Sequence, residues 1–492
     1  MKNILASMIK SKTSKQFIIV KVQAALLGFF PVVMFFPLVM AIVLQERLMI
    51  RAFAFPMGIT AVLSFWGFMS MRKKKLYLNA RDGFFLVFAT WILASLIGAI
   101  PFYFAGHSLS DSLFESSCTF ATTGATTISN VEALPRSLLL WRSLAHWFGG
   151  IGIVLISVAL MPLLGIGGFQ LIKAEAPGPE KEKITPKITD TAKLLWLAYC
   201  ALTAALFGLY LLGGMSWFDA LCHALTTMAS GGVSTKNAGI ASFNSPFIEV
   251  VTTVFMLLAG LNFNLYYRLL KGKISDIKNN TEARVYFLIF IIAAFACAFL
   301  LKPIYGSFLQ ALRYATYQSA SVLSTTGAAI ADYEKWPAAV QAILFCLMLV
   351  GGCSGSTAGG IKVVRHVVLW KQTGNELNRL LYPKGVFNIH LNKRVGRKDV
   401  VYSVASFFFL YIAVVAVTTV VTATSGVDVF SSLSAALSIT GNIGVGFGAV
   451  GPAHNYGAFP NYVKWFYSLV MIAGRLELWT VFFIFNPAFW RK

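Results

Sequence analysis

The sequence predicts an all-α polytopic membrane protein made of four similar repeats, with two further transmembrane helices at its N-terminus. Three observations support this fold class. Hydrophobic residues make up 57% of the chain and charged residues only 12%, and the mean hydropathy is +0.71, far above that of ordinary soluble domains. Apolar runs of about 20 residues, the length that crosses a bilayer, recur along the chain. Short glycine-containing polar segments interrupt these runs four times, which indicates an internal repeat.

Ten full membrane spans are expected from the apolar runs. They lie near residues 18–44, 53–71, 84–105, 138–163, 192–214, 246–270, 283–302, 338–369, 400–424 and 461–486. The first run continues to about Leu44 without a small-residue cleavage site. We therefore interpret it as the first span and not as a removed signal peptide.

Lysine and arginine residues are concentrated in alternate loops between the expected spans. Of the 41 Lys and Arg residues, 30 lie in residues 1–16, 71–82, 173–193, 268–284, 362–398 and 491–492. This alternation is the positive-inside pattern, and it predicts that these segments and both termini face the cytoplasm. No basic segment is interleaved with exposed aromatic residues, so the net charge of +22 does not indicate a nucleic-acid partner.

Four shorter segments lie between consecutive spans and end at the glycine-containing breaks. They run from Asp111 to Thr123, Asp219 to Gly231, Leu312 to Thr326 and Ser431 to Ile443. Segments of this length are too short to cross a bilayer. Irregular backbone at membrane depth is tolerated only where protein buries it or where it lines a water-filled cavity. We therefore expect four re-entrant half-helices, each ending in a loop.

These features divide the chain into an N-terminal two-helix segment and four pore repeats, each made of a span, a half-helix, a glycine loop and a second span. The expected boundaries are 1–75 for the N-terminal segment and 76–172, 173–272, 273–385 and 386–492 for the repeats. Equal spacing from the half-helices pairs Gly124 with Gly232 and Gly327. In the fourth repeat spacing favours Gly444, whereas the preceding threonine favours Gly441, and we expect Gly444.

The glycine loops have the chemistry of a cation pathway. Half-helices aimed at one axis present the negative ends of their dipoles to a central cavity, and glycine lets the loops turn carbonyl oxygens inward to replace the water shell of an ion. The loops contain hydroxyl groups but no Asp or Glu, and neutral oxygens suit K⁺ or Rb⁺ better than a divalent ion. The predicted ion-coordinating residues are Thr122, Thr123, Gly124, Ser230, Gly231, Gly232, Thr325, Thr326, Gly327, Asn442, Ile443 and Gly444. Close helix packing is the alternative role of such glycines, but it does not account for four of them in register.

A second glycine-rich stretch interrupts the span at 338–369, and we expect it to break that helix in two. Runs of glycine and serine are costly in a helix, although the alternative is a simple kink. The residues that form this break include Gly351, Gly352, Ser354, Gly355, Ser356, Thr357, Gly359 and Gly360.

Arg475 lies about midway along the last expected span, where an unpaired guanidinium would be costly. Free carbonyls at the helix end near Gly351 could be its partner, in which case Arg475 contacts the glycine-rich stretch. The alternatives are a static anchor, or a pair with Glu477, for which two residues along one helix is poor geometry.

At this point the residues resemble the Trk/Ktr/HKT superfamily of potassium transporters, and within it the TrkH-like bacterial membrane subunits. The similar stretches are WRSLAHWFGGIGIV at 141–154, AEAPGP at 174–179, FDALCHALTTMASGGVST at 218–235, FMLLAGLNFNLYY at 255–267, GGCSGSTAGGIK at 351–362 and GRLELWTVFF at 474–483. Two differences from the family pattern are Ala121, where threonine is frequent, and the fourth loop, which lacks proline after its glycine.

The resemblance implies a homodimer of pseudo-fourfold pores in the bacterial cytoplasmic (inner) membrane, with one glycine per repeat and two extra N-terminal helices. It also implies that residues 351–360 form an intramembrane loop that obstructs the pore as a gate, in which the glycine, serine and threonine residues named above, together with Arg475, would act in gating. A separate ring of TrkA-like nucleotide-binding subunits is the implied cytoplasmic regulator. The permeant ion would be K⁺, and this chain would carry no organic cofactor. The resemblance leaves open whether flux is passive or coupled to another ion.

Single features of the sequence also fit two other functions, coupled transport of another solute and intramembrane proteolysis. A proton- or sodium-coupled transporter of another solute would normally carry intramembrane carboxylates, for which only Glu115 and Glu477 come close. GCSG at 352–355 matches an intramembrane serine protease motif, which needs a histidine base such as His146 or His366. Proteolysis would leave the four half-helices unexplained, so we do not expect an enzyme.

Overall fold

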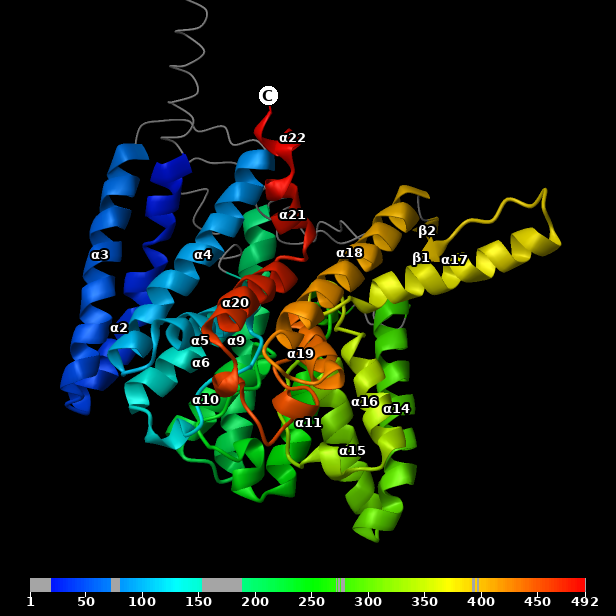
Figure 1. Ribbon diagram of the computed structural model, residues 1–492, viewed down its shortest axis with the longest axis horizontal. Helices are drawn as coiled ribbons and strands as arrows, with labels where there is room; N and C mark the ends of the chain where they lie inside the picture. Colours follow the sequence, from blue (N-terminus) through cyan, green and yellow to red (C-terminus); the bar gives the residue numbers. More distant parts are fainter. Residues whose placement is uncertain are drawn as a thin grey trace, which may run out of the picture.

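The computed structural model describes residues 19–71, 80–152, 188–270, 272, 275, 279–391, 394–395 and 398–491. Within these ranges the regular structure is helical apart from β1 (His390–Leu391) and β2 (Arg394–Val395), which pair antiparallel. Figure 1 shows the helices gathered into one bundle, from which one long helix extends sideways. The all-α fold class predicted from the sequence is confirmed.

Two long apolar helices precede the repeats, as predicted. They are Ile19–Val43, which includes α2 (Phe29–Val43), and α3 (Arg47–Met71). The two helices pack against each other, and α2 also contacts α6 (Arg136–Ile151) of the first repeat. Large apolar side chains on their outer side are exposed, which is the expected surface of helices that face lipid.

Each repeat begins with a long helix followed by a short one. The long helices are α4 (Ala80–Phe104), α9 (Ile188–Leu212), α14 (Thr281–Tyr305) and α18 (Lys398–Ala423). The half-helices are α5 (Leu109–Ala121), α10 (Trp217–Met228), α15 (Phe308–Leu323) and α19 (Val429–Gly441). Every half-helix packs against the long helix of its own repeat. The predicted pattern of span and re-entrant half-helix is therefore present four times.

The second helix of each repeat starts after an irregular segment that contains short 3₁₀ turns. The second helices are α6, α11 (Pro246–Ala259), α16 (Ala338–Met348) and α20 (Asn461–Arg475), and the turns are η1 (Val131–Ala133), η2 (Gly239–Phe243), η3 (Tyr333–Lys335), η4 (Gly448–Val450) and η5 (Tyr456–Ala458). The half-helix of one repeat packs on the second helix of the preceding repeat: α10 on α6, α15 on α11, α19 on α16, and α5 on α20. Because α5 of the first repeat contacts α20 of the last, the four repeats close into a ring.

Side-chain caps fix where three of the half-helices begin. Ser108 Oγ accepts a hydrogen bond from the Asp111 amide (3.1 Å), and Ser216 Oγ accepts one from the Asp219 amide (3.1 Å). Asp428 caps α19 in the same way, with its Oδ2 3.0 Å from the Ser431 amide nitrogen. Hydrogen bonds from Ser431 hold the pKa of the Asp428 carboxyl below its ordinary value. Such caps satisfy amide groups that a helix start leaves free.

Two of the ten expected spans are wrong as continuous helices. The apolar run 246–270 forms α11 and α12 (Phe263–Leu270), which meet at 97°, and the run 461–486 forms α20 and α21 (Trp479–Phe485), which meet at 114°. An apolar window measures composition only, so it does not detect a bend in the backbone. A short helix, α22 (Pro487–Trp490), follows α21.

The span expected at 338–369 is broken, as predicted, into α16 and α17 (Val363–Leu381), with residues 349–362 between them. Of the span expected at 138–163, the structure describes α6 as far as Ile151, and residues 153–163 lie outside the described ranges. By length and composition, the described residues contain six helices able to cross a membrane, or up to eight if each bent pair counts as one span.

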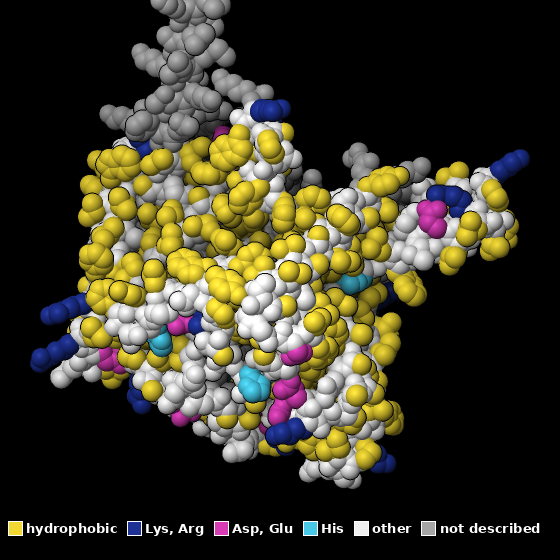
Figure 2. All heavy atoms as spheres, viewed as in Figure 1, with side chains coloured by type: hydrophobic (Ala, Val, Ile, Leu, Met, Phe, Trp, Pro, Cys, Tyr) yellow, Lys and Arg dark blue, Asp and Glu magenta, His cyan; other side chains and the backbone are white. Residues whose placement is uncertain are grey.

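The surface matches a protein that sits in a bilayer. Figure 2 shows hydrophobic side chains over much of the upper and middle part of one face, with charged side chains mainly toward its lower edge and on the protruding helix. Exposed apolar residues on the outer helices include Phe409 (77% exposed) and Phe299 (65% exposed). A soluble domain rarely exposes so much contiguous apolar surface, whereas lipid tails cover it at little cost.

Candidate functional site

The loops that follow the four half-helices share one backbone conformation. In each loop a residue with a left-handed backbone is followed two positions later by a glycine with positive φ. These pairs are Thr122 and Gly124 (φ 53° and 81°), Ser230 and Gly232 (52° and 60°), Thr325 and Gly327 (54° and 73°), and Asn442 and Gly444 (54° and 93°). The shared dihedral angles show that the four loops are structurally equivalent.

The four glycines lie side by side in a closed ring. A Cβ atom added to any one of them would overlap a carbonyl oxygen of the loop in a neighbouring repeat. The overlapping pairs are Gly124 with Gly231 O, Gly232 with Thr326 O, Gly327 with Ile443 O, and Gly444 with Thr123 O. The carbonyl comes each time from the residue just before a ring glycine. The ring is thus made of backbone, and only glycine fits at these positions in this conformation.

Gly444, and not Gly441, occupies the ring position of the fourth repeat. Gly441 is the last residue of α19, and its backbone does not have a positive φ. Gly444 has the positive φ and the close approach to a neighbouring carbonyl that the other three glycines have. Equal spacing was therefore a better guide to structural equivalence than the preceding threonine.

A layer of small polar side chains supports the ring from behind. In three repeats, the side chain six positions before the ring glycine donates a hydrogen bond to a backbone carbonyl oxygen. That carbonyl belongs to the residue immediately after the glycine. These bonds are Cys118 Sγ to Ala125 O (2.8 Å), Thr226 Oγ1 to Val233 O (2.9 Å) and Ser321 Oγ to Ala328 O (2.6 Å). The fourth repeat has Ser438 at this position, and that hydroxyl lies 3.3 Å from Tyr456 Oη. The three bonds tie the first three loops to their own half-helices.

The side chains of the loop residues are buried, and several contact other protein groups. Ser230 Oγ donates to Ala229 O (2.7 Å) and to Thr357 Oγ1 (3.1 Å), and Thr325 Oγ1 accepts from the Gly359 amide (2.6 Å). Their hydroxyls therefore hold the glycine-rich stretch at 351–360. One hydrogen bond of the Ser230 hydroxyl goes to this stretch and the other to Ala229 O beside it, and the expected role of Ser230 in the ion pathway stays a prediction.

The stretch 351–360 lies at the C-terminal ends of the half-helices. Thr357 Oγ1 lies 3.1 Å from Met228 O, in the last residue of α10, and 3.1 Å from Ala259 O, at the end of α11. A Cβ atom on Gly359 would overlap Gly441 O, in the last residue of α19. The glycine-rich stretch is thus directly beside the base of the ring, where it brings together residues from three repeats.

This stretch also explains the bend between α11 and α12. The Cys353 amide donates to Gly260 O (2.8 Å), and the Phe263 amide donates to Gly355 O (3.0 Å). Both bonds use backbone groups that a continuous helix through 246–270 would have paired internally. The bend in the second repeat and the loop of the third repeat therefore provide hydrogen-bond partners for each other's free backbone groups.

Arg475 contacts the loop at a point different from the one expected. Its Nη1 donates to Thr357 O (2.6 Å), and its Nη2 donates to Gly149 O (2.8 Å) and Gly150 O (2.6 Å) at the end of α6. The expected carbonyl partners near Gly351 are replaced by one carbonyl in the middle of the loop and two from the first repeat. The guanidinium thereby connects α6, α20 and the loop.

Two charged residues near the loop, Glu282 and Arg365, were not predicted, and Glu477 has a partner other than the Arg475 considered above. The Glu282 carboxylate accepts from the amide of Ser354 (2.6 Å), within the glycine-rich stretch, and from the amide of Val364 (3.1 Å), in the first turn of α17. Glu477 pairs with Arg365 on α17, and the Arg365 guanidinium lies 3.8 Å from the centre of the Phe407 ring. Glu282 resembles an ordinary acidic residue in the first turn of a helix, so the sequence held no signal for its second role.

The candidate bases of a serine protease do not form a catalytic pair in the structure. His146 Nδ1 lies 2.9 Å from Arg142 O, and among the described residues the Nε2 atoms of His146 and His366 have no hydrogen-bond partner. Described His, Cys, Asp and Glu residues also form no group of three or more that could hold a metal ion. The glycine ring with its loop remains the candidate site.

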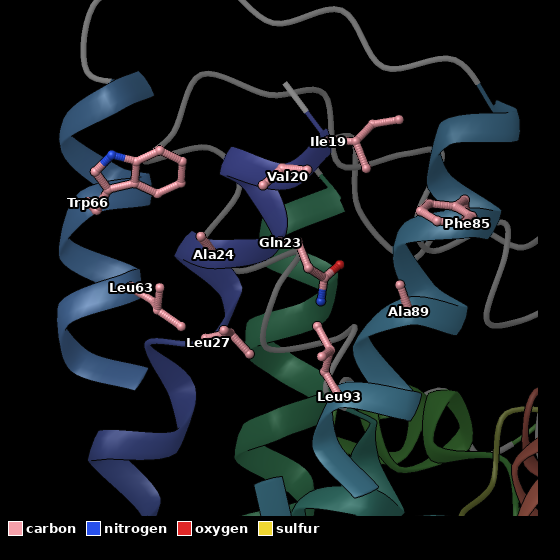
Figure 3. A pocket seen from close by; sticks show the side chains of 10 residues that line it. All are labelled: Ile19, Val20, Gln23, Ala24, Leu27, Leu63, Trp66, Phe85, Ala89 and Leu93. Atoms are coloured by element: carbon pink, nitrogen blue, oxygen red, sulfur yellow. The ribbon is translucent and has the colours of Figure 1, made fainter. Parts of the chain in front are cut away.

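An apolar cavity of about 270 Å³ lies away from this site, between the residues 19–27, α3 and α4. Figure 3 shows its side chains, which come from those three segments and from no glycine loop. Its polar member, Gln23, donates to Thr90 Oγ1 (3.0 Å). The cavity therefore offers no route for an ion.

Comparisons with known proteins agree on one family. The family model described as "TrkH: Cation transport protein" matches residues 50–305 and 306–492. The Trk system potassium uptake protein TrkH of Escherichia coli (strain K12) is 37% identical over 428 residues, which cover 86% of this chain and 88% of that protein. The protein of the same name from Halomonas elongata is 36% identical over 481 residues, covering 96% of this chain and 99% of that one. The crystal structure of the potassium transporter TrkH from Vibrio parahaemolyticus superposes with a TM-score of 0.86 at 32% identity, over 97% of this chain and 100% of that chain.

Proposed function

The chain belongs to the TrkH family of cation transport proteins, and from this premise we propose that it carries K⁺ into the cell through the ring of Gly124, Gly232, Gly327 and Gly444. The protein is a membrane transporter and not an enzyme, in line with relatives that are named potassium uptake proteins. The pathway crosses the bacterial cytoplasmic membrane, with both termini on the cytoplasmic side.

The observation that carries this proposal is the closed ring of backbone around four equivalent glycines. A carbonyl oxygen from each repeat, in the residue just before the glycine, is available to replace the water shell of an ion. The half-helices end at these loops, so the negative ends of their dipoles favour a cation. The twelve residues predicted to coordinate the ion include no carboxylate. Such neutral oxygens favour K⁺ and Rb⁺ over divalent ions.

The loop 351–360 is proposed to be the gate of this pathway. It lies against the ends of α10, α11 and α19, next to the base of the ring. Its residues are mostly glycine, serine and threonine, so hydrogen bonds to neighbouring repeats, and not large apolar side chains, hold it in place. Arg475 supports the closed position through Thr357 O, and its positive charge also opposes cations beneath the ring.

We further propose two kinds of protein partner, both implied by the family resemblance. They are a second copy of this chain, which gives a homodimer, and a cytoplasmic ring of TrkA-like nucleotide-binding subunits. The basic loops of this chain support a cytoplasmic face on the side of residues 362–398. The boundaries 76–172, 173–272, 273–385 and 386–492 are the corresponding proposal for the four repeats.

A coupled transporter of another solute is less well supported by the buried carboxylates. A coupling site needs acidic groups that exchange protons or ions at the membrane midplane. Glu115 lies beside Arg142, Glu249 binds Arg313 through two hydrogen bonds of 2.5 and 2.6 Å, and Glu477 pairs with Arg365. Each of these three acidic groups has an arginine partner, and the buried Glu282 accepts from the Ser354 and Val364 amides.

Flux into liposomes tests the proposal. Purified protein in vesicles, with the membrane potential set, should pass K⁺ and Rb⁺ faster than Na⁺. Equal rates for the three ions would contradict the proposed selectivity. Uptake that continued only with a proton or sodium gradient would favour coupled transport.

A further inference from the structure

A single position on the half-helices differs in chemistry from repeat to repeat. Nine residues before the ring glycine stand Glu115, His223, Gln318 and Ala435. All four side chains are buried, with at most 2% of their surface exposed. Since the four loops share one backbone conformation, these residues occupy equivalent places behind the ring, yet only the first repeat has a carboxylate there.

In the first repeat this carboxylate holds the outer part of the glycine loop. Glu115 Oε1 accepts hydrogen bonds from Thr126 Oγ1 (2.7 Å), from the Thr127 amide (2.7 Å) and from Thr127 Oγ1 (3.3 Å). These groups lie two and three positions after Gly124. Hydrogen bonds to an ionised acceptor are stronger than neutral ones, so Glu115 ties the loop to α5 more firmly than a hydroxyl would.

An arginine on the next helix makes the buried charge tolerable. Arg142 Nε lies 3.2 Å from Glu115 Oε2, and the side chains are 3% and 0% exposed. A buried carboxylate without a counter-charge would be strongly destabilising. Glu115 therefore has one oxygen hydrogen-bonded to the loop, while the other lies at ion-pair distance from Arg142 on α6 without forming a hydrogen bond.

The other repeats lack this charged brace. In the second repeat His223 Nε2 lies 2.8 Å from Ser234 Oγ, which is a neutral contact to the equivalent part of the loop. In the fourth repeat the side chain of Ala435 has no polar atom. Its neighbour Ser434 contacts the loop instead, with Oγ accepting a hydrogen bond from the Phe447 amide (2.7 Å). In the third repeat both amide atoms of Gln318 have no hydrogen-bond partner among the described residues. The brace is strongest in the first repeat and weakest in the third.

We infer that Glu115, held by Arg142, is a positioning residue that keeps the first glycine loop in the shape in which its carbonyls face the ion. The inference rests on the proposed function, because it assigns a cause to selectivity at that ring. Glu115 itself does not touch the ion. It acts by restricting the conformational freedom of the residues that follow Gly124. Without this restriction the carbonyl oxygens of the loop would no longer have the fixed positions that distinguish K⁺ from Na⁺.

The test compares equivalent positions with the same substitution. Glu115→Leu combined with Arg142→Met removes both charges while keeping side-chain volume, which avoids an unpaired buried arginine. Glu115→Gln keeps an acceptor and removes only the charge. Gln318→Leu is the matched control, since its amide holds nothing in the described residues. Selectivity is read as the K⁺/Na⁺ permeability ratio of reconstituted full-length protein, with size-exclusion chromatography as the check of folding.

We expect the ratio to fall by about tenfold in the double variant, because strong hydrogen bonds of this kind shift a local equilibrium by that order, and to fall less in Glu115→Gln. Gln318→Leu should keep the ratio of the wild type. A role in stability alone would lower the melting temperature of the Glu115 variants and leave the ratio unchanged, and that result overturns the inference. A wild-type protein without K⁺ preference would instead overturn the proposed function itself.

Discussion

Gly444 lies against the carbonyl oxygen of Thr123, so that the glycine loop of the last repeat meets the glycine loop of the first. The same contact joins each of the other loops to a neighbour, and the ring closes without a side chain between its members. Four chain segments far apart in sequence thus present one continuous rim of backbone. We expect ion selectivity to depend on this rim and basal flux to depend on the loop beneath it.

Gly232→Ser should reduce the preference for K⁺ over Na⁺. Gly232 has φ +60°, and an added Cβ atom would overlap Thr326 O, so the ring must distort to admit the side chain. The permeability ratio in liposomes is the measurement. Gly208→Ser is the control, because Gly208 on α9 has no atom within 4 Å of an added Cβ. An unchanged ratio in folded Gly232→Ser protein would remove Gly232 from the selective ring.

Gly444→Ala should disturb permeation more than Gly441→Ala. Alanine at Gly444 meets both a positive φ of 93° and overlap with Thr123 O. At Gly441 the nearest atom to an added Cβ is Tyr411 Oη at 3.2 Å, which is tight but leaves the helical backbone intact. Parallel flux assays of the two variants decide the order. The reverse ranking would show that the ion pathway does not use the ring position at Gly444.

Arg475→Ala should raise basal K⁺ flux in the absence of any regulatory partner. The change removes the charge-assisted bond to Thr357 O, and contacts of this kind are worth roughly 1.5–3 kcal/mol. A shift of that size moves an open–closed balance about tenfold or more towards open. Arg379→Ala is the control, since Arg379 pairs on the surface with Glu376. If Arg475→Ala folds normally and conducts no faster than wild type, Arg475 is a static anchor.

Removing part of residues 354–358 should raise basal flux as well. The deletion takes away the segment that touches the ends of α10 and α11, while the ring above it keeps its own hydrogen bonds. Single-channel recording on purified protein measures the effect, and the K⁺/Na⁺ ratio should remain near that of the wild type. Loss of selectivity without a gain in flux would mean that the loop supports the ring and does not gate it.

Glu282→Gln should loosen the same loop from its other side. Glu282 accepts from the Ser354 and Val364 amides, and hydrogen bonds to a charged acceptor are about twice as strong as neutral ones. We expect a modest rise in basal flux and a lower melting temperature. Glu376→Gln on the exposed part of α17 is the matched control. A lower melting temperature with unchanged flux would assign Glu282 to stability alone.

The fold was largely predictable because it depends on composition and periodicity. Apolar length located the long helices, and the shortness of α5, α10, α15 and α19 separated half-helices from spans. The bends after Ala259 and Arg475 were not predictable in this way. The bend after Ala259 depends on hydrogen bonds such as the Cys353 amide to Gly260 O, which join two repeats and leave no local pattern.

The candidate site was predictable only in its repeated part. Register along the chain located the four ring glycines, since equal spacing is visible in one sequence. The predicted hydrogen-bond partners of Arg475 were wrong in detail. Two of the observed acceptors, Gly149 O and Gly150 O, belong to a different repeat. Glu115 was noticed only as a membrane carboxylate, and its pairing with Arg142 depends on how α5 packs against α6.

The central claim is that the glycine ring selects K⁺, and a reversal potential tests it most directly. Purified protein in a planar bilayer, with K⁺ on one side and an equal concentration of Na⁺ on the other, should give a current that reverses at a strongly K⁺-selective potential. Replacing K⁺ by Rb⁺ should change that potential little. A reversal at zero voltage in the wild-type protein would show that the ring does not distinguish the two ions, and would contradict the account.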